Sequence, residues 1–332
     1  MYSQKDQKMT KMQDDPLFSI ILVAYDVSKY IEKAILSVLN SSFDSWELII
    51  IDDGSKDGTY EICQSYEYLS KVNVYQMSRI GLGSARNLAL KKATGRYILF
   101  LDGDDRVDEN IMNHLHLKIK LNEYDLLSFQ WQTENNDTGV IANTLSPETT
   151  IAVWNKCYRR QWLNDHGIVF LEDVYYEDVS FTLEVVHGGP KSITIPHLGY
   201  VYTKRKQSIT HMPFQTKNAR DTLTVFQHLS CQLTKFNSDF ERSYIVDFWW
   251  RHLLLMLNAD KLDGKDFLLK AMIDTYVSSG LDLLNDGPYK NTSFIMKFKC
   301  MDLLLRRGWY AGAANINLFA DFVHTLITKI KF

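Results

Sequence analysis

Proline, cysteine and long hydrophobic runs are all scarce in this chain of 332 residues. There are 6 prolines and 4 cysteines, and the cysteines lie far apart without a CxxC pair, at Cys63, Cys157, Cys231 and Cys300. This spacing argues against a disulfide framework or a paired-cysteine zinc site, and it predicts reduced thiols in a cytosolic protein. No stretch reaches the roughly 18 apolar residues that a membrane-spanning helix needs, so we do not expect an integral membrane protein.

An excess of one charge is also absent. Lysine and arginine number 37 against 40 aspartates and glutamates, a net charge of -3, which gives no reason to expect nucleic acid as a partner. The composition, 45% hydrophobic and 23% charged, is that of a globular protein. Residues 1–16 are polar and lack the apolar core of a signal peptide, so we expect a flexible leader there.

From Phe18 onward, short apolar runs alternate with stretches of helical periodicity. The runs typical of buried strands are residues 18–25, 46–52, 72–77, 97–102 and 124–132. The helical stretches are residues 31–39, 58–69, 84–93 and 175–189. This alternation predicts an α/β fold with a mostly parallel sheet flanked by helices, whose ligands bind beyond the carboxyl ends of the strands. Residues 133–150 are polar and rich in turn formers, which indicates a hairpin or loop insertion.

Three carboxylates follow the strand at 97–102 in the stretch "YILFLDGDDR", at Asp102, Asp104 and Asp105. Closely spaced carboxylates favour hard cations such as Mg²⁺ or Mn²⁺, which also accept phosphate oxygens as ligands. The alternative is an aspartate-rich turn or a helix cap, and that reading suits Asp105 and Asp108. The stretch alone leaves both readings open.

Two further polar clusters follow neighbouring strands. Asp52 and Asp53 end one strand in "IIIDDGSKDGT", where a carboxylate can accept hydrogen bonds from a base or ribose, or simply shape the loop. The stretch "SRIGLGSARNLAL" looks like a degenerate dinucleotide fingerprint, but it follows the third strand and has Arg86 in place of the last glycine. We therefore reject a dehydrogenase. Arg79 and Arg86 are candidates to hold a phosphate or to pair with the aspartates, and a solvated arginine is the alternative.

The order of these stretches, continued by "VWNKCYRRQWL" and "YEDVSF", closely resembles the family 2 glycosyltransferases. These are bacterial enzymes of the GT-A fold that use nucleotide-sugar donors, and the resemblance covers residues 17–212. It implies a catalytic domain at 17–213 and leaves a helical C-terminal region at 214–332. It also implies a UDP-sugar donor and Mn²⁺ or Mg²⁺ as cofactor.

The resemblance assigns roles to residues that match the family's motifs. Asp104 would ligate the metal, and Asp178 would be the catalytic base, with Glu177 beside it. An inverting transfer needs such a carboxylate to take the proton of the acceptor hydroxyl, although acids in a first helical turn are also favoured by the helix dipole. The remaining matches imply contacts with the nucleotide-sugar, at Ala24, Tyr25, Asp26, Asp53, Arg86, Asp102 and Gly103.

The stretch "VYTKRKQSITH" is similar to a segment that closes over the donor diphosphate in related enzymes. Its candidates are Lys204, Arg205, Ser208 and His211, and a solvated charged surface is the alternative. This chain departs from the family at the first turn, where "VAYD" replaces a pattern with proline and asparagine. Asp26 therefore adds a carboxylate near the expected base pocket.

The C-terminal region ends in "INLFADFVHTLITKIKF", whose apolar residues fall on one helical face next to basic residues. Such a helix can lie on an anionic membrane, or it can pack on its own domain or another subunit. Together with the resemblance, this leads us to expect an inverting transferase in the cytoplasm, either free or bound to the inner face of the membrane. Its acceptor would be a glycan, a lipid-linked sugar or a glycoprotein. The alternative is a module of the same fold that binds nucleotide-sugars or glycans without catalysis.

Overall fold

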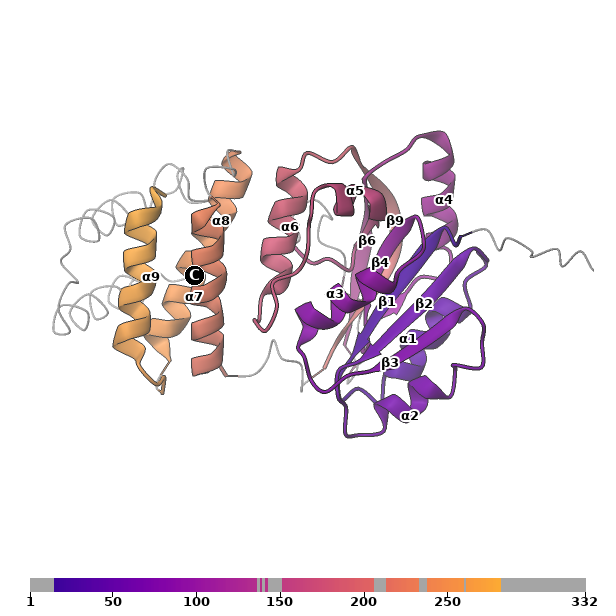
Figure 1. Cartoon of the computed structure of the whole chain (residues 1–332), viewed down its shortest axis with the longest axis horizontal. Coiled ribbons are helices and arrows are strands. Elements are labelled where there is room, and N and C mark those ends of the chain that lie inside the picture. Colours follow the sequence, from indigo (N-terminus) through magenta and orange to yellow (C-terminus); the bar gives the residue numbers. More distant parts are fainter. Residues whose placement is uncertain are drawn as a thin grey trace, which may run out of the picture.

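A mixed sheet forms the centre of the larger lobe in the computed structural model (Figure 1). The structure describes residues 15–135, 138, 141–142, 151–205, 213–232, 238–259 and 261–281. The strands are β1 (Phe18–Ala24), β2 (Trp46–Asp52), β3 (Val72–Gln76), β4 (Tyr97–Asp102), β5 (Arg106–Val107), β6 (Leu126–Asn135), β7 (Ile141–Ala142), β8 (Lys156–Arg159) and β9 (Ser192–Lys204).

The strand order is β3-β2-β1-β4-β8-β6-β9-β5, with β7 paired to β6. The first four strands are parallel, and the pairing runs from Phe18↔Trp46 to Ala24↔Asp52 between β1 and β2. Strand β8 is antiparallel to both β4 and β6, whereas β6 and β9 are parallel. The predicted α/β fold is confirmed, and the sheet is mixed.

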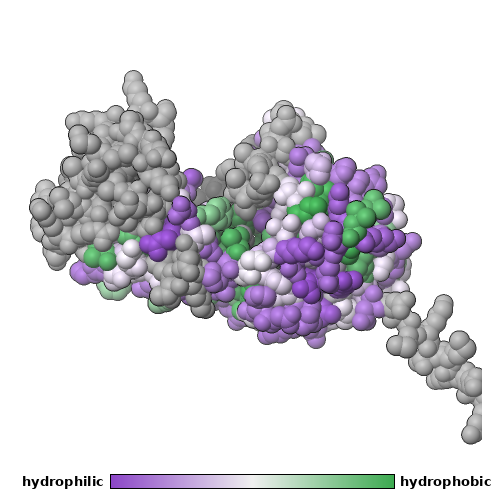
Figure 2. Space-filling view, turned by 90° about the horizontal axis from the view of Figure 1, so that it is seen from above, coloured by the Kyte–Doolittle hydropathy of each residue, from purple (hydrophilic) through white to green (hydrophobic). Residues whose placement is uncertain are grey.

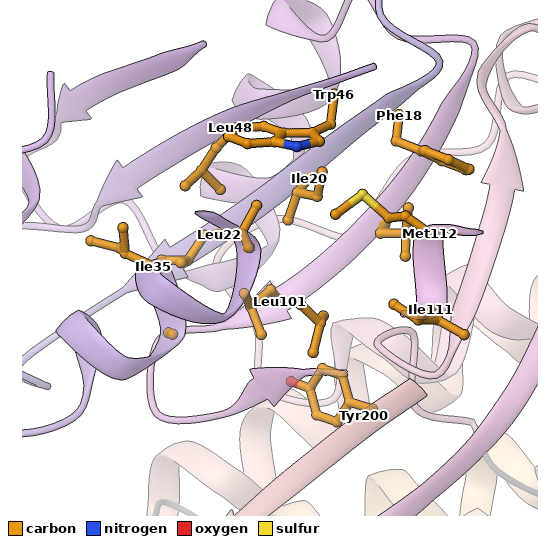
Figure 3. Packing of buried hydrophobic residues seen from close by; sticks show 14 of the residues in the cluster. Phe18, Ile20, Leu22, Ile35, Trp46, Leu48, Leu101, Ile111, Met112 and Tyr200 are labelled. Atoms are coloured by element: carbon orange, nitrogen blue, oxygen red, sulfur yellow. The ribbon is translucent and has the colours of Figure 1, made fainter. Parts of the chain in front are cut away.

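Helices cover both faces of this sheet. The helices of the larger lobe are α1 (Ile31–Leu39), α2 (Thr59–Gln64), α3 (Leu82–Lys92), α4 (Ile111–Leu121), α5 (Arg160–Asp165) and α6 (Glu177–His187). Figure 3 shows one face, where Phe18, Ile20 and Leu22 of β1 lie near Ile35 of α1 and Met112 of α4. The other face packs Ile21, Val23 and Phe100 against α3 and α6. Alternate residues of β1 thus enter two separate cores, as expected of a strand buried on both sides.

Among the described residues, three further helices form a second lobe beside α6 (Figure 1). They are α7 (Thr216–Cys231), α8 (Asp239–Asn258) and α9 (Lys265–Ser279). Ser238 caps α8 through a reciprocal bond with Glu241, the arrangement that satisfies free amides at a helix start. The core of this lobe also includes Val179 and Leu183 from α6, so a shared apolar cluster joins the two lobes.

The described surface is mixed in character. Figure 2 shows a mostly hydrophilic face with separate small apolar patches. Among the described residues, no helix combines the length and hydropathy that crossing a bilayer requires. The amphipathic stretch at 316–330 lies outside the described residues, as do residues 1–14 of the expected leader.

Candidate active site

The aspartates after β4 lie at the carboxyl edge of the sheet, next to the end of β1. Gly103 donates its backbone N–H to Val23 O at 3.0 Å. A Cβ atom at Gly103 would lie 3.0 Å from Val27 Cγ2 and 3.1 Å from Val23 O, so a side chain would push this loop away from β1. The glycine of the Asp-Gly-Asp stretch therefore allows the close approach of two strand ends.

Arg86 of α3 joins the first aspartate of this loop to the acidic pair on α6. Its Nη2 atom lies 2.8 Å from Asp102 Oδ1, and its Nη1 atom lies 2.7 Å from Glu177 Oε1. The arginine side chain is only 4% exposed. A planar guanidinium is suited to hold two carboxylates in fixed positions at once. Arg86 thus organises the acidic residues, one of the two roles that the sequence left open, and its contact with a donor stays a prediction.

Glu177 and Asp178 occupy the first turn of α6. Burial raises the pKa of Glu177 to about 7, against the opposing effect of Arg86. Burial also raises the pKa of Asp178, and Arg86 opposes this shift too. Lys156, at the start of β8, is buried nearby, and its ammonium interacts with Asp178. Carboxyls with raised pKa values at the start of a helix are suited to proton transfer.

The other two aspartates of the loop have different surroundings. Asp105 is buried, accepts bonds of 2.7 Å from Tyr200 Oη and Thr203 N, and ties the loop to β9. Burial raises its pKa well above the usual range. Asp104 faces Arg205, whose Nε lies 2.5 Å from Asp104 Oδ2. The turn reading therefore suits Asp105, whereas Asp104 is paired with a cationic side chain just beyond β9.

A metal site made by protein groups alone is absent from the described residues, which hold no group of three or more candidate ligands. The residues present nevertheless fit a cation bound jointly with a substrate. Mg²⁺ is usually held by one or two carboxylates plus phosphate oxygens and water. Asp104 supplies one such carboxylate at the edge of the sheet, and its present partner is a side chain rather than a backbone amide.

Asp53 lies at the end of β2, on the other side of β1. Its carboxylate accepts backbone bonds from Ile80 (2.6 Å) and Gly81 (3.0 Å), and its own N–H donates to Ala24 O (2.8 Å). Burial raises its pKa, although both amide bonds oppose the shift. Asp53 therefore shapes the loop between β3 and α3 and is also placed beside the strand-one turn.

The turn after β1 presents an aromatic ring. The Arg79 guanidinium lies 3.7 Å from the centre of the Tyr25 ring. Asp26 has a left-handed backbone (φ 48°), and its Oδ1 accepts a 2.9 Å bond from Lys56 N. The extra carboxylate expected from the sequence thus joins two loops. A flat ring beside a guanidinium and a carboxylate is a surface on which a base can stack.

The structure brings together Asp102, Asp104, Arg86, Glu177 and Asp178. It places Ala24, Tyr25, Asp26 and Asp53 at the neighbouring ends of β1 and β2. Of the basic segment, Lys204 ends β9, and Arg205 also lies 5.6 Å from the Tyr30 ring centre. Ser208 and His211 lie outside the described residues. Sequence reasoning assigned no role to Lys156, although it stands in the quoted "VWNKCYRR" stretch beside a buried strand.

Comparison with known proteins finds a matching family and several similar proteins. The family described as Glycosyl transferase family 2 matches residues 19–171. The uncharacterized glycosyltransferase EpsJ of Bacillus subtilis is 29% identical over 60% of this chain and 64% of its own length. An uncharacterized glycosyltransferase of Haemophilus influenzae is 30% identical over 55% of this chain and 76% of its own length.

The third relative has a known fold. The poly(ribitol-phosphate) beta-N-acetylglucosaminyltransferase TarS of Staphylococcus aureus is 26% identical over 71% of this chain and 44% of its own length. The crystal structure of S. aureus TarS 1-349 in complex with UDP-GlcNAc has a TM-score of 0.56, at 20% identity over 95% of this chain and 93% of that chain. The likeness of the structures concerns the fold, while the chain spans less than two thirds of TarS and EpsJ.

Proposed function

We propose that this chain, which belongs to glycosyl transferase family 2, transfers a hexose or N-acetylhexosamine from a UDP-sugar to a hydroxyl group, with inversion. One observation carries the proposal. Arg86 bonds both Asp102 of the Asp-Gly-Asp loop and Glu177 of the acidic pair. Arg86 thereby joins the loop proposed to bind the donor diphosphate to the acidic pair that contains the proposed proton acceptor, and sugar transfer to a hydroxyl needs both.

In the proposed reaction, Asp178 takes the proton of the acceptor hydroxyl as this attacks the sugar. Its pKa, raised by burial, brings the base closer to neutral pH, where proton transfer is most effective. Glu177 holds Arg86, and Asp102 faces the ribose. The base of the donor stacks beside Tyr25 and Arg79, where Asp53 supplies a hydrogen-bond acceptor. Ala24, Asp26 and Gly103 shape the same surface.

Asp104 would hold Mn²⁺ or Mg²⁺ next to the donor diphosphate. A cation there would neutralise the diphosphate as it leaves. In the structure, Arg205 Nε lies 2.5 Å from Asp104 Oδ2. Arg205 would therefore turn toward the diphosphate when the donor binds, together with Lys204, and Ser208 and His211 stay candidates from the sequence.

The donor and acceptor are proposed by class. UDP-GlcNAc is the first donor to test, because it is the compound named with TarS. The acceptor would be a glycan, a lipid-linked sugar or a glycoprotein. The enzyme would act in the cytoplasm, in the synthesis of a polymer destined for the cell surface. Residues 17–213 would form the catalytic domain, and 214–332 would contribute to acceptor, membrane or subunit contacts.

The test measures release of UDP from a panel of UDP-sugars with and without Mn²⁺, for the wild type and Asp104→Ala. We expect slow hydrolysis of one sugar that needs the cation and is lost in Asp104→Ala. Asp44→Ala is the matched control, because the Asp44 side chain is almost fully exposed. UDP binding without release from any sugar would overturn a catalytic function and favour a binding module.

A further inference from the structure

The loop at residues 171–176, which leads into the acidic pair Glu177 and Asp178, has an unusual backbone. Tyr176, directly before Glu177, has φ 67° and ψ 27°, and Asp173 has φ 55°. A left-handed conformation is rare for a bulky residue such as tyrosine. Such conformations persist when the surrounding structure holds them in place, and they are frequent at functional sites. Because Asp178 follows this loop in the chain, the contacts of residues 171–176 help to determine the direction of its side chain.

On one side the loop touches α3 through the backbone. A Cβ atom at Gly83 would lie 2.1 Å from Leu171 O and 3.4 Å from Glu177 Cβ. Asn87, one turn further along α3, accepts a 2.9 Å bond from Phe170 N. This side of the loop is held by the helix that also carries Arg86.

On the other side the loop is bonded to α7 in the second lobe. Asp221 is buried, and its Oδ2 accepts a 3.0 Å bond from Tyr175 N. The same oxygen accepts a 2.9 Å bond from Lys217 Nζ, whose ammonium lies 4.9 Å from the centre of the Tyr175 ring. A buried carboxylate that bonds a loop amide and a lysine fixes the loop more firmly than a neutral pair would.

The next residue of the loop is held by α7 and α8. Asn218 and Thr222 act on the Tyr176 hydroxyl by lowering its pKa, against the larger effect of burial, which raises it. The Tyr176 ring meets His252 and Phe248 edge-on, with ring centres 4.6 and 5.9 Å apart. Because Val179 and Leu183 of α6 share the core of α7–α9, the start of α6 rests on the second lobe.

We propose that Asp221 is a positioning residue for sugar transfer. Its bond to Tyr175 N fixes the loop from the second lobe, so that Asp178 keeps the direction needed to reach the acceptor hydroxyl. The helical lobe thus takes part in catalysis by holding the base. This inference rests on the proposed function, because it assigns Asp178 the role of base.

The test compares Asp221→Ala, Asp221→Asn and the control Asp274→Ala. Asp274 pairs with Lys270 at the same i, i+4 spacing on α9, away from the loop. Hydrogen exchange of peptides covering residues 172–178 and kinetics of UDP release are measured for each. For Asp221→Ala we expect exchange in that loop at least tenfold faster, with β1–β4 unchanged. We expect kcat at least tenfold lower, with KM and UDP affinity within threefold. Asp221→Asn, which keeps an acceptor for Tyr175 N, should restore kcat to within threefold.

Two results would overturn the proposal. One is an unchanged kcat and loop exchange in Asp221→Ala, and the other is an equal loss in Asp274→Ala, which would indicate general destabilisation. If Asp221→Ala does not fold, Lys217→Met decides, because it removes the second partner of Asp221 Oδ2 at a half-exposed side chain; unchanged exchange and kcat there reject the proposal. Exchange needs no turnover, so a wild type that releases no UDP refutes the proposed function separately.

Discussion

The loops after β2 and β4 flank the end of β1, and both are rich in aspartate, yet their carboxylates have different partners. After β2, Asp53 bonds two backbone amides and Asp52 accepts from Ser55 N. After β4, Asp102 and Asp104 pair with the side chains of Arg86 and Arg205. Backbone amides cannot leave without remodelling the loop, and the buried Arg86 holds Asp102 in place, whereas the partly exposed Arg205 can turn away from Asp104. The first loop is therefore suited to a fixed surface, and in the second loop Asp104 is suited to exchange Arg205 for a cation and a diphosphate.

The largest effect should come from removing the Arg86 guanidinium, which the buried Glu177 and the partly buried Asp102 share. Arg86→Met leaves Glu177 and Asp102 without their partner, and breaking a buried ion pair from one side costs about 3–5 kcal/mol. Urea unfolding should show that loss, and adding Glu177→Gln should recover part of it. A loss below about 1 kcal/mol would mean that water or other groups already compensate these carboxylates.

Asp53→Ala tests the fixed loop. It removes the acceptor of the Ile80 and Gly81 amides, and because both residues are only partly buried, the two lost bonds together cost about 1–3 kcal/mol. We expect a smaller loss of stability than for Arg86→Met, together with at least tenfold weaker UDP binding by calorimetry. Asp44→Ala again serves as the exposed control. Undiminished UDP affinity in Asp53→Ala would show that this loop does not form the base pocket.

The pH dependence should distinguish a base from a merely structural carboxylate. Asp178 acts deprotonated, and burial raises its pKa above the ordinary value of 3.8. Activity should therefore fall as the pH is lowered, starting at a higher pH than a free aspartate would require. Below the raised pKa, kcat/KM should drop tenfold per pH unit, while UDP affinity changes less. A profile flat down to the ordinary aspartate range would argue against Asp178 as the base.

Much of the sheet was predictable because its strands are local apolar runs. The periodicity of β1–β4, α3 and α6 is written in adjacent residues, and these elements lie close to their predicted ranges. Strand β9 was not predicted. Its stretch contains Pro196 and Gly199, and its pairing with β6 shifts register around Gln130, which interrupts the alternation. The antiparallel direction of β8 is also a long-range property that no local pattern encodes.

The candidate site likewise combines residues that local sequence patterns predicted with partners that only long-range packing brings together. Residue types and order pointed to Asp102, Asp104 and Asp178 as candidates, through strand ends and resemblance. Their partners could not be predicted, since Arg86 and Glu177 lie 91 positions apart and meet only through packing. The bond between Asp221 and Tyr175 likewise joins two lobes that the sequence suggested were separate.

The most direct test of the account compares UDP binding and UDP-sugar turnover for the wild type and Asp178→Asn. The substitution keeps the shape of the side chain and removes its ability to take a proton. We predict UDP affinity within twofold of the wild type and turnover lower by about 10²- to 10⁴-fold, the usual contribution of a general base. Turnover at the wild-type rate in Asp178→Asn would contradict the account.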